Sequence, residues 1–191
     1  MISKIAFKRF FLFPFLGALV AIVGFGASFN TAGAATKYLP LNSVQQAAVN
    51  GVQYSDMMSI RQQNGRTHLP EVACLDNAAK VWATAMATSG FHHSDPTTLD
   101  QAACPGSNFR GHGENIGEVV PCTSTDAWII GNACSQPMFN SFFLSPEHRA
   151  NMLDPVNPNT GQRIVWTGVG VGCYEAPNGT LFIVHEFAQN W

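Results

Sequence analysis

The sequence predicts an α+β domain, because helical and strand patterns occupy separate parts of the chain. Apolar residues recur at helical spacing over residues 42–64 and again over 76–88. Near the C-terminus, residues 167–174 and 181–189 carry alternating strand patterns on either side of Pro177-Asn178-Gly179. Since Asn-Gly is among the strongest hairpin signals, the two strands are expected to pair antiparallel.

Residues 1–35 have the pattern of an export signal. Three positive charges lie within the first nine residues, and no charge follows over residues 10–29. Small residues at 32–35 then fit a cleavage site, which would leave residues 36–191 as the mature domain. The alternative is an uncleaved membrane anchor, because about 20 uncharged residues can span a bilayer. Proline and glycines within the segment favour cleavage, so we expect a secreted, extracellular protein.

The composition of the mature part narrows the possible partners. Removing the three positive charges of the signal takes the formal net charge from −2 to −5. A mildly acidic domain without a basic cluster gives little reason to expect nucleic acid or an anionic membrane as partner. About 156 residues suit one domain with one core, and we expect a monomer that leaves the membrane after signal cleavage.

Five cysteines lie in the exported part: Cys74, Cys104, Cys122, Cys134 and Cys173. Export favours disulfides, and the odd count leaves one thiol free or paired between molecules. No Cys-x-x-Cys spacing occurs, which argues against a zinc ribbon or a thioredoxin-type site. The sequence leaves the connectivity open; Cys122 with Cys134 is the favoured pair, because the two bracket a segment that interrupts the helical pattern.

The sequence contains start and stop signals for the two long helices. The first is expected to stop at Gly65, and the second to begin at a capping Asp76 and to end at Gly90. Trp82 is expected in the core. The expected buried positions are Val44, Ala48, Val52 and Met58 in the first helix, and Ala78, Val81, Trp82, Ala85 and Met86 in the second.

The middle of the chain gives weaker signals. Residues 96–110 are turn-rich without a periodic pattern, and short helices are expected on each side of a break at 131–137. Residues 111–117 lie between the turn-rich segment and these short helices, and they contain three glycines around Glu114. Glycines gather in this way where the backbone must closely approach a ligand or another part of the chain. The alternative is a surface glutamate in a glycine-rich turn. A dinucleotide-binding loop is excluded, because no strand precedes the glycines and the third is misplaced.

Residues 145–153 are typical of a helix start. Ser145 is a good N-cap, and Pro146 suits the first helical position. His148 falls in the first turn, where the helix dipole disfavours a positive charge, so its neutral imidazole could serve a metal or a proton transfer. The alternative is that His148 only caps its helix or packs on a neighbour.

The C-terminal strands carry two further observations. Glycines at 168, 170 and 172 indicate that something bulky covers one face of that strand. His185-Glu186 begins like the zinc-binding motif of a metalloprotease helix, but the second histidine of that motif is absent and the segment has a strand pattern. A metalloprotease motif is therefore rejected. No Gly-x-Ser-x-Gly nucleophile elbow occurs either.

Four pieces of the chain, in this order, resemble the CAP superfamily, named for cysteine-rich secretory proteins, antigen 5 and pathogenesis-related 1 proteins. They are Phe91-x-His93-Ser94 after the second helix, Gly113-Glu114-Asn115-Ile116-Gly117, Ser145-Pro146-x-His148-Arg149-x-Asn151-Met152-Leu153, and Gly168-Val169-Gly170-Val171 with Glu186-Phe187-Ala188. The resemblance spans nearly all of residues 42–191 and is closest to the compact bacterial secreted branch. It implies a three-layer α-β-α sandwich with a central, mostly antiparallel sheet.

The resemblance also implies a cleft with two histidines and two acidic residues. His93, Glu114 and His148 match three of these positions, and His93 rather than His92 is the first histidine because it directly precedes the serine. The fourth position departs from the family, because Ser145 stands where many eukaryotic members have glutamate. Glu186 is a candidate for the second carboxylate, with burial against the sheet layer as the alternative.

Two functions are compatible with such a cleft. The preferred one is binding of a lipid-like or peptide ligand, with zinc or another divalent cation held by His93 and His148. Two imidazoles and the Glu114 carboxylate would leave an open coordination position on such an ion, or Glu114 would instead orient one imidazole without touching the ion. The other is a metal-dependent hydrolase in which Glu114 is the general base on a metal-bound water. A structural or cell-wall role, with the cleft as a relic, is the third possibility.

Overall fold

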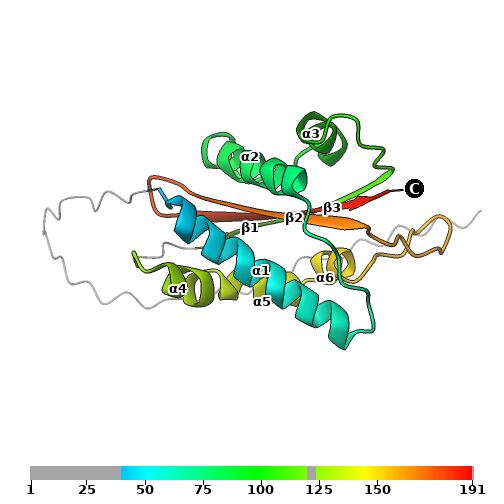
Figure 1. Ribbon diagram of the computed structural model, residues 1–191, viewed down its shortest axis with the longest axis horizontal. Helices are drawn as coiled ribbons and strands as arrows, with labels where there is room; N and C mark the ends of the chain where they lie inside the picture. The colour runs from blue at the N-terminus through cyan, green and yellow to red at the C-terminus, as the bar shows by residue number, and fades with distance from the viewer. Residues whose placement is uncertain (1–39, 120–123, 191) are drawn as a thin grey trace, which may run out of the picture. The chain divides into compact units, whose positions relative to one another are not determined.

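The computed structural model describes residues 40–119 and 124–190, so the expected signal segment lies outside the described residues. The helices and strands confirm the α+β class (Figure 1). Their bounds are α1 Ser43–Gln63, α2 Ala73–Ser89, α3 Pro96–Ala103, β1 Gly111–Val119, α4 Ala127–Ile129, the π-helical turn η1 Ile130–Cys134, α5 Gln136–Leu144, α6 Pro146–Met152, β2 Gly168–Glu175 and β3 Leu181–Gln189. Among these described helices, none combines the length and the apolar character needed to cross a membrane.

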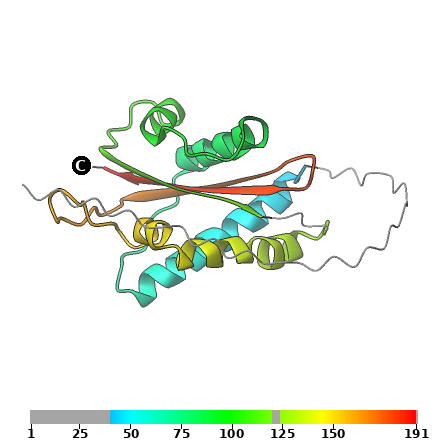
Figure 2. The same ribbon diagram turned by 180° about the vertical axis from the view of Figure 1, so that it is seen from behind.

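The three strands form an antiparallel sheet in the order β1-β3-β2. Helices α2 and α3 cover one face, and α1, α4, α5 and α6 cover the other (Figures 1 and 2). Both faces of the central strand are therefore buried. Leu181, Ile183 and Phe187 join the core under α1 and α5, whereas Phe182 and Val184 pack beneath α2. The expected three-layer sandwich is confirmed.

The predicted hairpin is present with its bounds shifted by at most one residue. Gly179 adopts a φ of 86°, in the left-handed region that glycine tolerates, and Asn178 Oδ1 accepts a hydrogen bond from Thr180 N at 3.0 Å. The Asn-Gly turn thus sets the register of β2 on β3.

Helix α2 lies directly on the glycine face of β2. A Cβ atom added to Gly170 would collide with the backbone of Leu75 and Asp76, and one added to Gly172 would collide with the backbone of Lys80. Asp76 Oδ1 accepts a hydrogen bond from Val171 N at 2.8 Å, which ties helix to strand. The bulky neighbour expected from the glycines is α2 itself.

Several expected details of the two long helices are wrong. Asp76 is not a cap, because α2 begins three residues earlier at Ala73 and uses this carboxylate against β2. Val44 and Val81 are 67% and 50% exposed. The buried residues of both helices overlap only in part with the expected buried positions. In α1 they include two polar side chains, which the pattern of apolar residues could not indicate. The buried residues are Val49, Gln53, Met57, Met58 and Arg61 in α1, and Leu75, Ala78, Ala79, Ala83 and Met86 in α2.

Two segments without clear patterns also form regular structure. Residues 96–103 fold as α3, because the Asp95 carboxylate caps the helix by accepting a hydrogen bond from Thr98 N at 3.5 Å, and proline occupies the first turn. The expected break at 131–137 is instead largely bridged by the π-helical turn η1. Gly131 permits this close packing, since a Cβ there would lie 2.9 Å from the carbonyl oxygen of Ala48.

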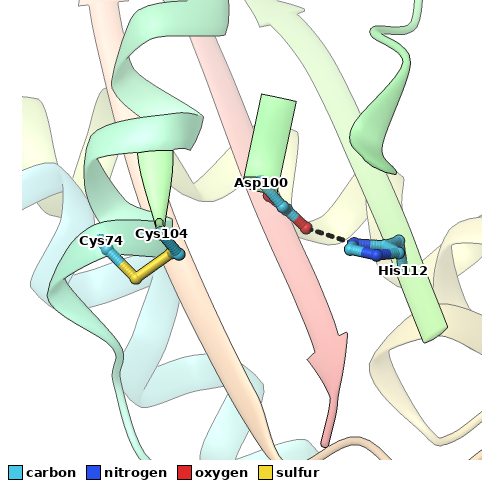
Figure 3. Close-up of a disulfide and its surroundings, with 4 residues drawn as sticks. All are labelled: Cys74, Asp100, Cys104 and His112. Atoms are coloured by element: carbon cyan, nitrogen blue, oxygen red, sulfur yellow. Dashed lines mark hydrogen bonds and ion pairs between the residues drawn. A yellow bond between two sulfur atoms is a disulfide. The ribbon is translucent and has the colours of Figure 1, made fainter. Parts of the chain in front are cut away.

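Within the described residues, a disulfide joins Cys74 at the start of α2 to Cys104 at the end of α3 (Figure 3). Cys173 is the free cysteine of the described residues, and burial raises the pKa of its thiol to about 12, so it is an unreactive core residue. Cys134 is disulfide-bonded. Cys122 lies outside the described residues, so the expected pairing of these two cysteines stays a prediction.

Candidate functional site

Glu114 holds His93 in a fixed orientation. The Oε1 atom of Glu114 lies 2.6 Å from His93 Nδ1 and accepts a second hydrogen bond from Ser94 N at 3.0 Å. The Glu114 side chain is 3% exposed, whereas the His93 side chain is 58% exposed. Since a carboxylate can only accept, Nδ1 carries the hydrogen, and Nε2 of a neutral His93 keeps its lone pair.

His148 approaches from the opposite layer, on the first turn of α6. Its ring packs edge-on against Phe142 with centroids 5.1 Å apart. Burial is the main cause that lowers the pKa of His148, and the charge of His93 adds to it. A neutral imidazole was expected from the helix dipole, and the direction agrees, although the main cause is burial. The influence of His93 means that the two imidazoles lie within electrostatic range.

Two asparagines connect α6 to β1. Asn115 Nδ2 donates to the carbonyl oxygen of His148 at 3.1 Å, and Asn151 Nδ2 donates to Asn115 Oδ1 at 3.0 Å and to the carbonyl oxygen of Glu114 at 3.1 Å. These bonds fix the backbone of His148 relative to that of Glu114. Both asparagines stand in the motifs that carry the resemblance, but sequence reasoning gave them no role.

Glu186 stands opposite Glu114 in the β1–β3 register and is fully buried. Burial raises the pKa of Glu186 well above its ordinary value, and the charges of Glu114 and Asp100 raise it further. A neutral carboxyl group buried under α2 and α3 matches the second of the two expected alternatives. Glu186 therefore does not offer a charged oxygen to a ligand.

A buried hydrogen bond between a histidine and an aspartate lies beside these carboxyl groups. His112 Nδ1 is 2.7 Å from Asp100 Oδ2, and Asp100 is inaccessible to solvent (Figure 3). The pair joins α3 to β1 two residues before Glu114. Sequence reasoning missed it, because Asp100 falls in the segment expected to be turns.

Ser145 occupies the expected N-cap position of α6, but its side chain makes no capping hydrogen bond. Its hydroxyl group donates instead to Glu147 Oε2 at 3.2 Å. The departure from the family's acidic position thus leaves a small hydroxyl residue three positions before His148.

The match to a family model decides the relationship. The model described as the cysteine-rich secretory protein family, CAP, matches residues 55–187, which is most of the chain. The chain belongs to the CAP family. No curated protein matches it.

Solved structures support the CAP fold. An outer surface protein of Borrelia burgdorferi is similar, with a TM-score of 0.55 and 14% identity over 74% of this chain and 92% of the other. An extracellular SCP-domain protein of Bacillus anthracis has a TM-score of 0.56 and 19% identity over 76% of this chain and 41% of the other. A cysteine-rich secretory protein of Staphylococcus aureus has a TM-score of 0.55 and 13% identity over 78% of this chain and 40% of the other. The chain spans about two-fifths of the latter two proteins, and at these identities the likeness shows the fold alone.

The donor set of the CAP site suits a divalent cation only in part. Over residues 40–119 and 124–190, no group of three or more histidine, cysteine or acidic side chains is arranged to hold a metal. His93 and His148 offer two imidazole nitrogens, and Glu114 stands behind His93 in the position of an orienting carboxylate. A zinc-like ion held here would take its remaining ligands from water or from a bound molecule.

Replacing Glu186 with glutamine should raise the stability of the CAP domain increasingly as the pH rises. The folded protein keeps the proton of Glu186 to a higher pH than the unfolded chain, which releases it above its ordinary pKa of 4.5, so the parent loses stability as the pH rises past that value. Glutamine keeps the shape and cannot ionise. The Tm difference between variant and parent, followed from about pH 4 to about pH 8, should grow steadily.

The exposed Glu118→Gln variant, which lies on the same strand, is the matched control and should show no such trend. A Tm difference for Glu186→Gln that stays constant over this pH range would show that Glu186 is ionised in the folded protein.

Proposed function

We propose that this CAP domain acts outside the cell as a binding protein, in which His93 and His148 hold the polar end of a lipid-like ligand, with or without a divalent cation. The observation that carries the proposal is the contact between Glu114 Oε1 and His93 Nδ1. It leaves Nε2 of an exposed ring as a fixed acceptor, since the hydrogen resides on the other nitrogen. His148 adds a second neutral imidazole.

Binding fits this arrangement better than hydrolysis does. A general base must reach the water that it deprotonates. The Glu114 side chain is almost fully buried, and its Oε1 atom already accepts two hydrogen bonds. Its position therefore supports an orienting role and leaves the hydrolase without the base that it would need.

Exposed apolar side chains adjoin both histidines along the chain. Phe91, two residues before His93, is 49% exposed, and Leu144, four residues before His148, is 77% exposed. A ligand with one polar group and an apolar tail would satisfy the imidazoles and cover these side chains. This combination favours a lipid-like ligand over a peptide.

A fluorescent fatty-alcohol analogue tests the ligand class, because its hydroxyl group can donate a hydrogen bond to the free imidazole nitrogen of His93. The purified protein should bind the analogue saturably, and His93→Ala and His148→Ala should each weaken binding by about ten-fold or more, because each removes one polar anchor. His92→Ala is the matched control, since that ring packs on Trp82 and bonds to the Gly90 carbonyl oxygen. Equal affinities of all four proteins, or no saturation, would refute the proposal.

Calorimetric titration with zinc tests the cation separately. The parent should bind zinc, both alanine variants should lose binding, and Glu114→Gln should weaken it by about 10–100-fold, as loss of an orienting carboxylate typically does. Zinc binding by His93→Ala and His148→Ala equal to that of the parent would place the ion elsewhere. Binding of the fatty-alcohol analogue without zinc binding would leave the lipid proposal intact and remove the cation from it.

A further inference from the structure

Helix α6 has a second functional face, opposite the one that carries His148. The Asn151 side chain faces β1, where it donates to the carbonyl oxygen of Glu114 and to Asn115 Oδ1, and the His148 ring packs on Phe142 of α5. Positions 146, 149, 150 and 153 recur at helical spacing about half a turn away, and they line a hollow of about 310 Å³. This hollow is separate from the histidine site.

The hollow gathers positive charge in a chain that is acidic overall. Arg66, Arg149 and Arg163 all line it, and we call it the arginine hollow. Asp154 is the one acidic residue of its lining. The carboxylate of Asp154 is already taken by the buried Arg61, at 3.0 and 3.2 Å, so it does not neutralise the three lining arginines.

None of the three guanidinium groups forms an ion pair within residues 40–119 and 124–190. The Arg149 guanidinium lies over the Phe143 ring, with Cζ 5.7 Å from the ring centroid, which leaves its N–H groups without a carboxylate partner. Arg163 Nη1 donates to the carbonyl oxygens of Leu153 and Asp154 at 3.2 and 2.9 Å, which holds the Arg163 guanidinium group at the edge of the hollow. Arg66 Nε is buried and has no hydrogen-bond acceptor. An unpaired buried donor is costly, and a turn of the Arg66 side chain toward a bound oxyanion would give Nε an acceptor.

A second hollow, of about 540 Å³, adjoins the first and shares Arg66 with it. Its other lining residues are mainly uncharged hydrogen-bonding groups: two hydroxyls, an amide and an imidazole, with one methionine. They are Ser55, Ser59, Gln62, His68 and Met58. Such a surface suits the hydroxyl groups of a sugar better than an apolar chain.

We propose that the arginine hollow binds the phosphate or sulfate group of an anionic carbohydrate, whose hydroxyl groups occupy the adjoining hollow. Guanidinium forks match tetrahedral oxyanions through paired N–H···O bonds, and three of them around one hollow favour a doubly charged group. The ligand would bridge the end of α1 and the outer face of α6. The histidine site on the inner face plays no part.

Calorimetry of the purified protein at constant ionic strength tests this site with three probes: inorganic phosphate, glucose 6-phosphate and glucose 6-sulfate. Glucose 6-phosphate should bind saturably and about ten-fold more tightly than inorganic phosphate. Arg149→Gln and Arg66→Gln should each weaken binding of every anion by about ten-fold. Lys80→Gln, an exposed charge change on α2, should bind like the parent.

The variants Ser59→Ala and Gln62→Ala test the adjoining hollow, and they should remove only the advantage of the sugar esters over phosphate. Tighter binding of the phosphate ester or of the sulfate ester identifies which oxyanion the ligand carries, and either supports the proposal. Arg149 is exposed, so its variant should fold normally. No saturable binding of any probe, or equal binding by parent and Arg149→Gln, would overturn the proposal. Equal affinity for phosphate and its sugar esters would overturn the assignment of the second hollow.

Discussion

Replacing Asp154 with alanine should lower the free energy of unfolding by about 3–5 kcal/mol, since it leaves a buried guanidinium group without its counter-charge. Arg61 is fully buried, and two of its nitrogens donate to the Asp154 carboxylate. The same carboxylate accepts a hydrogen bond from Trp166 N at 3.3 Å. Asp154 also has a φ of 64°, a region that aspartate tolerates better than alanine.

Urea denaturation of the single and double variants measures this coupling. Arg61→Met should also destabilise, but the double variant Arg61→Met/Asp154→Ala should lose clearly less than the sum, because the unpaired charge is gone. Additive losses, or a loss of less than about 1 kcal/mol for Asp154→Ala, would show that the pair contributes little.

Replacing Gly170 with valine should cost about 3 kcal/mol, because the added atoms meet the main chain of α2 and no side-chain rotation relieves the overlap. The sheet and α2 would have to separate, and the hydrogen bond from Val171 N to Asp76 would weaken with them. Thermal or urea unfolding of the variant gives the loss directly.

Gly51→Ala in α1 is the matched control. No atom lies within 4 Å of its added Cβ, and it sits within a helix, so alanine there should raise stability by about 0.5–1 kcal/mol. A loss at Gly170 no larger than about 0.5 kcal/mol would mean that α2 does not press on β2.

The parts of the fold that local patterns determine were predictable. The hairpin follows from an Asn-Gly turn between two segments in which apolar and other residues alternate. The two long helices follow from apolar residues that recur at helical spacing. Strand β1 was not predictable from its own residues, because glycine, asparagine and glutamate are poor strand formers. It forms because β3 offers it a partner and large side chains fill the space above its glycines: a Cβ at Gly113 would meet Trp166, and one at Gly117 would meet Met138 and Phe142.

The candidate site, too, was only partly predictable from the sequence. The motifs pointed to His93, Glu114 and His148, but only the fold shows that Glu114 is buried behind His93 and that Glu186 lies inside the sheet layer. The sequence also indicated no basic cluster, because residues 66, 149 and 163 lie far apart along the chain. Folding brings these arginines around one hollow, which no linear pattern could reveal.

The protonation of the two site histidines is the most direct measurement of how this site works. Long-range ¹⁵N–¹H correlation spectra of the imidazole rings, recorded at about pH 7, assign the hydrogen to one nitrogen of each ring. His93 should carry it on Nδ1 against Glu114, and Glu114→Gln should loosen that preference. His148 should be neutral. A His93 ring that carries its hydrogen on Nε2, or that averages between both forms like a free imidazole, would contradict the proposed role of Glu114.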